Sequence, residues 1–260
     1  MTKLLVEKLG GIATITLNRP EQGNAIDMDI AQDLARVASD CASDDAVRCV
    51  LLTGAGRMFC VGGDVGAFAD AGDNAGPFLR ELADVLHEAV LTFATMNKPL
   101  VTAVNGPAAG AGMSLAILGD IVIASDAAHF TAAYTGIGLT PDGGMSWLLP
   151  RLVGARVAQT MILTNRRVSA EEAVETGLVT RVAPSAALAA EASALAGQLA
   201  AGPVRALGAA RELLLIGNTH TLAEHLAAEA RAIAAAGEGA EAQEGIDAFL
   251  ARRKADFLKT

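Results

Sequence analysis

The chain is poor in aromatic residues, cysteines and positive charge, and each shortage excludes a class of protein. Only 3% of the 260 residues are aromatic, and the three cysteines (Cys41, Cys49 and Cys60) form no Cys-x-x-Cys pair. This odd, scattered set argues against a disulfide framework or a zinc site and favours a reducing cytoplasm. The formal net charge of -9 argues against nucleic acid or an anionic membrane as the main partner. We therefore expect a cytoplasmic protein that binds small molecules or copies of itself.

The sequence also lacks a convincing export signal or membrane span. The polar residues Glu7 and Lys8 interrupt the start of the chain, so no secretory apolar region forms there. Residues 99–119 carry no charge, but Asn105-Gly106-Pro107 in their middle would break a helix. This uncharged run therefore predicts a buried strand followed by a helix, and no contact with a membrane.

Strand-like and helix-like patterns alternate along most of the chain. The Gly10-Gly11 pair between two β-prone runs predicts a hairpin, and apolar residues at helical spacing after Asp27 predict an amphipathic helix. We predict strands over residues 4–9, 12–17, 47–53, 99–104 and 120–124, helices over 27–41, 77–96 and 111–118, and a mobile surface loop over 70–76. Recurrence of strand, loop and helix indicates an α/β fold.

The last third of the chain changes character and becomes rich in alanine. Ser169 and Glu172 have the spacing of a capping box, and Gly177 suits the end of the short helix that they begin. Beyond Pro184 the composition predicts helices over residues 186–260, with a break at Gly202-Pro203. We therefore expect a helical tail after the α/β part.

The most informative stretch runs from Lys98 to Ala116. An apolar β-prone run passes through the turn Asn105-Gly106-Pro107 into Gly/Ala residues that then become compatible with a helix. The small residues let a ligand touch the backbone, and free N–H groups at a helix start can receive an anion or a developing oxyanion. This stretch therefore predicts chemistry performed by the main chain.

Two other enzyme classes share features with this stretch. Gly112-Met113-Ser114 approaches the Gly-x-Ser-x-Gly elbow of serine hydrolases, but Ala116 replaces the last glycine. A dinucleotide-binding fingerprint fails because Leu115 occupies the position of the third glycine. Neither class accounts for the stretch as well as a main-chain anion site does.

Several motifs occur in a fixed order along the chain. They are Asn18-Arg19-Pro20 with Asn24-Ala25, then residues 59–64, 98–116, 138–144 and 149–154. Together these motifs resemble the crotonase (enoyl-CoA hydratase/isomerase) superfamily over essentially the whole length. The resemblance implies an α/β spiral of ββα turns with a helical C-terminal trimerisation region. It implies a core over residues 1–200 with an acyl-CoA site, an oligomerisation region over 201–260, and a homotrimer or a hexamer built as a dimer of trimers.

The resemblance also implies the catalytic groups. The backbone amides of Gly63 and Ala111 would form the oxyanion hole for a thioester oxygen, which gains charge when an enolate forms. Asp142 falls where some branches of the superfamily carry a catalytic aspartate. Asp142 is also placed to cap the following helix, a role compatible with catalysis. A single carboxylate suits a 1,3 proton shift, because it can remove a proton from one carbon and return it two carbons along.

The departures from the family pattern argue against ordinary hydration. Ser114 and Tyr134 stand where the hydratase branch carries two glutamates, and neither supplies a carboxylate to place and activate water. The Tyr134 hydroxyl is expected either to donate to the ligand or to Asp142, or only to fill a packing role. His87 falls where a dehalogenase of the superfamily carries an active-site histidine, which leaves open a hydrolytic mechanism with Asp142 as nucleophile.

Further residues are expected around the CoA moiety. The resemblance implies that backbone near Cys60 meets adenine, and that Arg57 and Lys254 meet phosphates, with Lys254 and Phe257 reaching a neighbouring subunit. No metal is expected, since His129, His220 and His225 lack ligand spacing. The predicted substrate and CoA contacts are Arg57, Cys60, Val61, Gly62, Asp64, Gly110, Ser114, Lys254 and Phe257.

The sequence therefore predicts an enoyl-CoA isomerase that uses no cofactor beyond the CoA of its substrate. Its oxyanion hole is Gly63 and Ala111, and Asp142 is the base. A hydratase is the first alternative. A hydrolytic dehalogenase and a non-catalytic acyl-CoA-binding oligomer remain open as well.

Overall fold

A computed structural model describes residues 2–260, and its main feature is a six-stranded sheet in the order β1-β2-β3-β4-β6-β9. The first two strands form an antiparallel hairpin across Gly10 and Gly11, whose φ angles of 59° and 81° suit such a turn. The other neighbours pair in parallel. The strands are β1 (Leu4–Leu9), β2 (Ile12–Leu17), β3 (Cys49–Gly54), β4 (Leu100–Val104), β6 (Ile121–Ser125) and β9 (Arg181–Ala183).

A second, three-stranded sheet lies beside the first in the order β5-β7-β8. Its strands are β5 (Ala108–Ala109), β7 (His129–Thr131) and β8 (Val168–Ser169). A single parallel bridge joins Cys60 to Ala108 in β5. The small sheet thus brings the loop after β3 next to the loop after β4.

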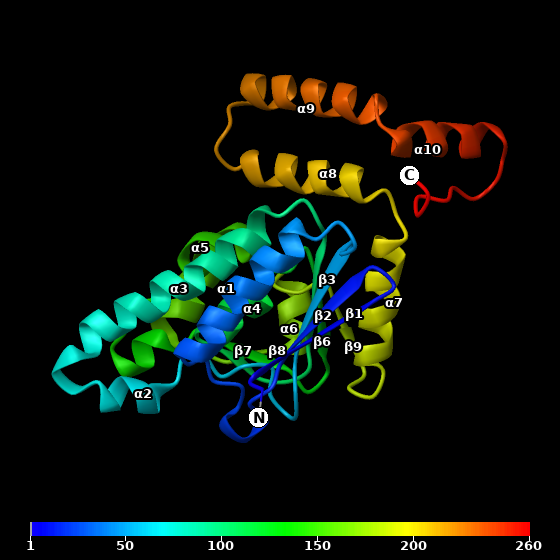
Figure 1. Cartoon of the computed structure of the whole chain (residues 1–260). Coiled ribbons are helices and arrows are strands. Elements are labelled where there is room, and N and C mark those ends of the chain that lie inside the picture. The colour runs from blue at the N-terminus through cyan, green and yellow to red at the C-terminus, as the bar shows by residue number, and fades with distance from the viewer. Residues whose placement is uncertain (1) are drawn as a thin grey trace.

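Helices cover both faces of the main sheet (Figure 1). One face packs on α1, α3 and α4 through the larger apolar core, and the other packs on α7 through a smaller core. The helices of these layers are α1 (Met28–Ser43), α2 (Val65–Asp70), α3 (Ala75–Thr95), α4 (Ala111–Ala116), α5 (Met145–Thr164), α6 (Ala170–Glu175) and α7 (Leu188–Ala200), with 3-10 turns η1 (Pro20–Gln22), η2 (Gly72–Asn74) and η3 (Tyr134–Ile137).

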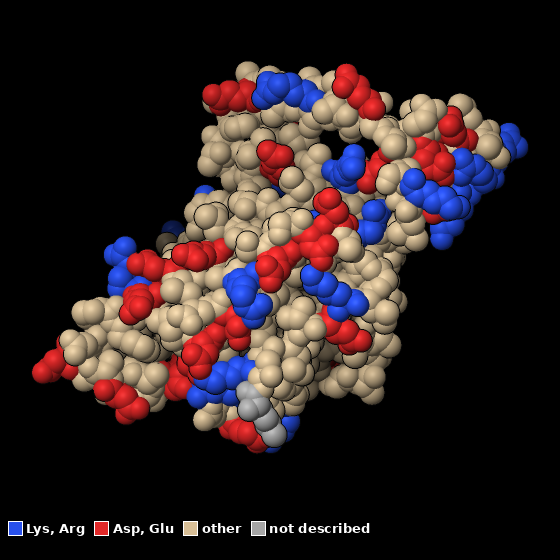
Figure 2. All heavy atoms as spheres, viewed as in Figure 1, with Lys and Arg blue, Asp and Glu red and all other residues tan. Residues whose placement is uncertain are grey.

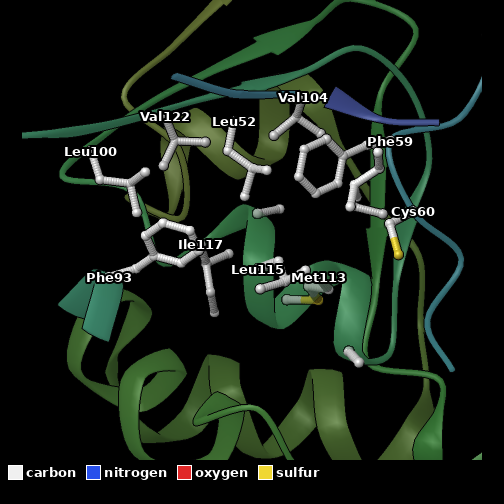
Figure 3. Packing of buried hydrophobic residues seen from close by; sticks show 14 of the residues in the cluster. Leu52, Phe59, Cys60, Phe93, Leu100, Val104, Met113, Leu115, Ile117 and Val122 are labelled. Atoms are coloured by element: carbon white, nitrogen blue, oxygen red, sulfur yellow. The ribbon is translucent and has the colours of Figure 1, made fainter. Parts of the chain in front are cut away.

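The short helix α4 lies at the centre of the larger core. All six of its residues are buried. Figure 3 shows Met113 and Leu115 of α4 among Leu52, Val104 and Phe59, which come from β3, β4 and the loop between them. The position of α4 is therefore fixed by close packing within the core.

Three further helices extend beyond the sheet. They are α8 (Val204–Ile216), α9 (Leu222–Gly237) and α10 (Ala240–Leu250), and Figure 1 places them on one side of the α/β layers. Arg211 of α8 ties them to the core, since it pairs with Asp120 at 2.7 Å and donates to the carbonyl of Phe93 at the end of α3. The division of the chain into domains at residue 200 stays a prediction.

Charge is mixed over the surface. Figure 2 shows acidic and basic side chains interleaved across the face formed by α1 and α3, with basic side chains gathered near the end of α10. Within residues 2–260, none of the helices is both long and apolar enough to cross a membrane.

The predicted hairpin, strands and long helices are confirmed, and Ser169 caps α6 by accepting from the Glu172 amide. The predicted surface loop over residues 70–76 is wrong. That stretch holds the end of α2, the turn η2 and the start of α3. The helices form there because Asp64 caps α2, and Phe68 packs against Phe78 with ring centroids 6.3 Å apart.

Candidate active site

A cavity of about 350 Å³ opens between α2, α3 and the segment that leads into α5. Its lining is mostly aliphatic, and Asp142 is the one carboxylate that the described residues contribute to it. The lining residues are Ile26, Val61, Gly62, Gly63, Val65, Phe68, Leu79, Arg80, Leu82, Ala83, Leu86, Gly110, Ala111, Ala133, Tyr134, Ile137, Leu139, Thr140 and Asp142. The cavity therefore suits an apolar group with a few polar atoms at one end.

Two backbone amides face this cavity from different loops. Gly63 lies just before α2, and Ala111 is the first residue of α4. Across residues 2–260, neither amide donates a hydrogen bond to a protein group. The loops approach so closely that a Cβ on Gly62 (φ 104°) would lie 3.5 Å from the Ala111 nitrogen. Two residues with unpaired amides thus lie in neighbouring loops of the cavity lining.

The Gly63 loop is held by polar contacts around Asn24. This residue is fully buried, and its amide nitrogen donates to the carbonyls of Ala55, Met58 and Phe59 at 2.8 to 3.0 Å. Its side-chain oxygen accepts from the Arg19 amide at 2.9 Å. Asn24 therefore fixes the path of the chain that leads to Gly63.

Asp64 supports the same loop and does not line the cavity. Its carboxylate accepts from Arg19 at 2.7 Å and from the amide of Gly66 at 3.1 Å, which caps α2. The bond from Arg19 holds the pKa of this carboxyl below its usual range. The charge of Asp64 is thus satisfied by Arg19 and the helix start, and its contact with the ligand stays a prediction.

The Ala111 loop is held by packing. Gly110 adopts φ 52°, and Gly112 lies so close to Cys60 that a Cβ there would come within 2.2 Å of the Cys60 carbonyl oxygen. The Cys60 side chain lies in the core (Figure 3), where burial raises the pKa of its thiol to about 12. Cys60 thus acts as a core residue in this chain, while its neighbours Val61 and Gly62 line the cavity.

Asp142 receives a hydrogen bond from the tyrosine of η3. The Tyr134 hydroxyl donates to Oδ1 of Asp142 at 2.6 Å, and it lies 3.2 Å from the Ser114 hydroxyl. Burial, together with the nearby charge of Asp142, raises the pKa of Tyr134 above its ordinary value. Tyr134 therefore stays a protonated donor throughout the ordinary pH range.

The expectation that Asp142 caps the following helix is wrong. Its side chain does not cap α5, whose N-cap is Gly144 without a side-chain bond. Trp147 in the first turn of α5 is exposed and stacks on Arg151, with 3.9 Å between the guanidinium and the ring centroid. A left-handed turn at Gly143 and Gly144 separates Asp142 from the helix start, and Asp142 lines the cavity instead.

The comparisons with known proteins assign a family to this site. The family model described as enoyl-CoA hydratase/isomerase matches residues 7–260. The chain belongs to the enoyl-CoA hydratase/isomerase family. It is 40% identical to the 1,2-epoxyphenylacetyl-CoA isomerase of Escherichia coli (97% of this chain, 96% of the relative) and 39% identical to a probable enoyl-CoA hydratase of Rhodobacter capsulatus (95% and 94%).

The crystal structure of a putative enoyl-CoA hydratase/isomerase from Mycobacterium abscessus superposes with a TM-score of 0.92. The two sequences are 36% identical, and the superposition covers 98% of each chain. The predicted crotonase-like α/β fold and the predicted enzyme family are thereby confirmed.

The structure of this family member brings most, though not all, of the predicted site residues together. Gly63, Ala111, Tyr134 and Asp142 line one cavity, and Ser114 lies directly behind Tyr134. Arg57, Lys254 and Phe257 are not part of its lining. Phe257 lies near the C-terminal end of the chain, and Figure 1 places that end beside α10. The Phe257 carbonyl accepts a hydrogen bond from the Arg48 side chain.

Sequence reasoning missed the wall that α3 contributes. Leu79, Leu82, Ala83 and Leu86 line the cavity from this helix. Their spacing is that of an apolar helical stripe, which predicts a buried face. The stripe could have been found from its spacing. Its residues border the cavity, and Leu82 and Leu86 also belong to the core, so periodicity alone does not reveal the cavity.

Proposed function

We propose that this protein is an enoyl-CoA isomerase that moves a carbon–carbon double bond by a 1,3 proton shift. The observation that carries the proposal is the convergence of one carboxylate, Asp142, and two unpaired amides, Gly63 and Ala111, on one apolar cavity. The relative named 1,2-epoxyphenylacetyl-CoA isomerase supports isomerisation of an acyl-CoA in general, since its named substrate is an epoxide and not an enoyl-CoA. The substrate class that we propose is an acyl-CoA thioester.

The proposed reaction starts with proton removal. With the thioester oxygen at the amides of Gly63 and Ala111, the Asp142 carboxylate takes a proton from an acyl carbon, and the electron pair moves onto the thioester oxygen. The two donors stabilise this dienolate, a contribution worth on the order of 3 kcal/mol for each donor in comparable sites.

The second half returns the same proton. Protonated Asp142 delivers it to the carbon two positions along, the electron pair returns from the oxygen, and the double bond lies in its new place. Atoms and electrons balance within the substrate and Asp142. We therefore propose that the step needs no cofactor beyond the CoA that the substrate carries.

Tyr134 has a supporting role in this proposal. Its hydroxyl donates to Oδ1 of Asp142, which leaves Oδ2 to act on the substrate. Replacing Tyr134 by phenylalanine removes the donor to Asp142, and we expect activity to fall because the carboxylate loses its fixed orientation.

Hydration is the second candidate, and the contacts of Ser114 and Tyr134 argue against it. Both hydroxyls bond to each other and to Asp142, so they are engaged in holding the base. Water addition needs a group that activates water and a separate source of the proton for carbon. Only one carboxylate of the described chain lines the cavity, which favours the proton shift.

Heavy water provides the deciding experiment. A β,γ-enoyl-CoA is incubated with the wild type and with Asp142→Asn, a variant of nearly the same shape, while bond migration and deuterium uptake are followed. We expect isomerisation in the wild type and a loss of about 10² to 10⁴-fold in the variant. Equal rates in both proteins would contradict Asp142 as base. Hydroxyacyl-CoA as the main product would support the hydratase, and no turnover would support a binding protein.

Oligomerisation is part of the proposal. The C-terminal helices expose large apolar side chains, and such an area on a soluble protein marks a contact surface. We propose a cytoplasmic homotrimer or hexamer in which Lys254 and Phe257 approach the CoA of a neighbouring copy. Sedimentation of the wild type and of Phe249→Glu tests this, and a monomeric wild type would contradict it. The exposed residues are Leu214, Leu222, Leu226, Ile233, Ile246, Phe249 and Leu250.

A further inference from the structure

The backbone amide that follows Asp142 is buried and donates to a histidine from another helix. The Gly143 N–H bonds to Nε2 of His87 at 3.0 Å, and His87 belongs to α3. A buried N–H without an acceptor is costly, so this bond satisfies a requirement of the fold. His87 thus contacts the chain at the catalytic loop without lining the cavity.

The other end of the same peptide unit is also held. The Asp142 carbonyl accepts from the Ser114 hydroxyl of α4 at 3.0 Å and from the Met145 amide at 3.1 Å. This carbonyl and the Gly143 N–H belong to one planar peptide group. His87 of α3 and Ser114 of α4 therefore form hydrogen bonds with opposite ends of one peptide group. Other residues of these two helices line the cavity.

These hydrogen bonds matter because the sequence of the loop allows many backbone conformations. Gly143 and Gly144 have φ angles of 60° and 81°, and two successive glycines leave the backbone many alternatives. Rotation of the peptide plane between Asp142 and Gly143 changes ψ of Asp142, and the rotamers open to a side chain depend on the φ and ψ of its own residue. A Cβ on Gly143 would lie 2.8 Å from Cβ of Ser114, so no larger residue could restrict the loop instead.

We propose that His87 is a positioning residue that, together with Ser114, clamps the Asp142–Gly143 peptide unit and so aims the Asp142 carboxylate. The proposal rests on the proposed function for its kinetic consequence, but the clamp itself does not depend on it. While Nε2 accepts from Gly143, its lone pair is occupied and the ring hydrogen lies on Nδ1. In this arrangement Nε2 cannot take a proton from water, which favours a proton shift over hydrolysis.

Amide hydrogen exchange in the unliganded protein tests the clamp without any assay of activity. The variants are His87→Leu, which removes the acceptor, and His87→Gln, whose side-chain oxygen can still accept. Glu88→Leu, an exposed neighbour on the same helix, is the control. We expect the Gly143 amide to exchange about tenfold faster or more in His87→Leu, and near the wild-type rate in His87→Gln and Glu88→Leu. Unchanged protection of Gly143 in His87→Leu would overturn the proposal.

Kinetics then separate positioning from direct catalysis. We expect kcat to fall about 10 to 100-fold in His87→Leu with KM nearly unchanged, because a misplaced base affects the chemical step more than binding. His87→Gln should recover most of the loss, since glutamine accepts the hydrogen bond but cannot act as a base at neutral pH. A His87→Gln variant as impaired as His87→Leu would overturn the positioning role.

A second variant protects the test against misfolding. Ser114→Ala releases the opposite end of the peptide unit, and we expect it to speed exchange at Gly143 and lower kcat in the same direction. Should Asp142→Asn keep full activity while exchange follows the expected pattern, the proposed function fails and the clamp stands. Wild-type protection of the Gly143 amide in both His87→Leu and Ser114→Ala would overturn the clamp and leave the proposed function untouched.

Discussion

The two amides that face the cavity are held in opposite ways. On the Ala111 side, every residue of α4 is buried and the helix lies inside the apolar core. On the Gly63 side, α2 has no buried residue, and the loop depends on Asn24 and on the pair between Arg19 and Asp64. One donor is fixed by packing and the other by hydrogen bonds and charge.

This difference predicts how each half of the site fails. A packed interior tolerates changes of pH and salt but resists added volume, because no space is left for a new atom. A polar network tolerates small changes in shape but loses stability when a buried partner is removed or a charge is neutralised. The two halves of one proposed oxyanion hole should therefore be separable by experiment.

The largest effect is expected from added volume on the packed side. In Gly112→Ala the new methyl group would lie 2.2 Å from the carbonyl oxygen of Cys60, a backbone atom that cannot move aside. We expect a loss of stability of about 3 kcal/mol or more, or failure to fold. Thermal unfolding measures it.

Gly76→Ala is the matched control. A methyl group there meets nothing within 4 Å, and Gly76 lies within α3. Alanine in a helix is favoured over glycine by about 0.5 to 1 kcal/mol, so this variant should keep or slightly gain stability. A stable Gly112→Ala protein would show that the Ala111 loop is not fixed by packing.

The next effect concerns the buried amide of the polar side. Asn24→Ala leaves the carbonyls of Ala55 and Phe59 without a donor, and the carbonyl of Met58 keeps only a bond of 3.3 Å from Asn105. We expect a cost of about 2 to 4 kcal/mol, since each buried unsatisfied group is expensive and the losses overlap. Denaturant unfolding, with turnover measured on the folded fraction, checks this value.

The direction of the Asn24 prediction can be sharpened with a near-isosteric change. Asn24→Asp keeps an acceptor for the Arg19 amide but offers no N–H to the three carbonyls when ionised. It should be at least as destabilising as Asn24→Ala, because it also buries a charge. A protein as stable as the wild type in both variants would contradict the role given to this network.

The sequence allowed prediction of whatever depends on periodicity and local chemistry. The hairpin at Gly10-Gly11 and the helix capped by Asp27 follow from patterns within a few residues, and the structure contains both. The stretch over residues 70–76 was predicted as a loop from its Ala, Gly and Asp content, yet it is mostly helical. Its helices are stabilised by the Asp64 cap and by packing of Phe68, effects that local composition does not express.

The candidate site was predictable only in part for a similar reason. Family motifs identified Gly63, Ala111 and Asp142, and the structure places them on one cavity. The bond between His87 and Gly143 joins residues 56 positions apart, so it depends on how α3 lies against the loop before α5. The false expectation that Asp142 caps α5 had the same origin, since an aspartate before two glycines has a local use that the folded chain does not adopt.

The smallest effect is the pH dependence of the stability that the Arg19–Asp64 pair contributes. It is also the effect most specific to the Gly63 side of the site. Arg19 lowers the pKa of Asp64 below its usual value of 3.8, so the ion pair stabilises the fold fully above that value. This contribution is lost as the pH falls below 3.8 and through the lower pKa of the folded state. Because both side chains retain some contact with solvent, we expect no more than about 1 kcal/mol.

Asp64→Asn isolates this contribution from the other carboxylates of the chain. Asparagine keeps the cap on α2 but has no charge to lose, so the difference in unfolding free energy between wild type and variant should shrink between pH 7 and pH 3. On the other side, the titratable side chains in contact with α4 include Tyr134 and Cys60, and burial raises the pKa of both, so that half of the site should show no such difference between pH 7 and pH 3. A gap between wild type and Asp64→Asn that stays constant with pH would mean that charge does not hold the Gly63 loop, and the contrast between the two halves would then rest on Asn24 alone.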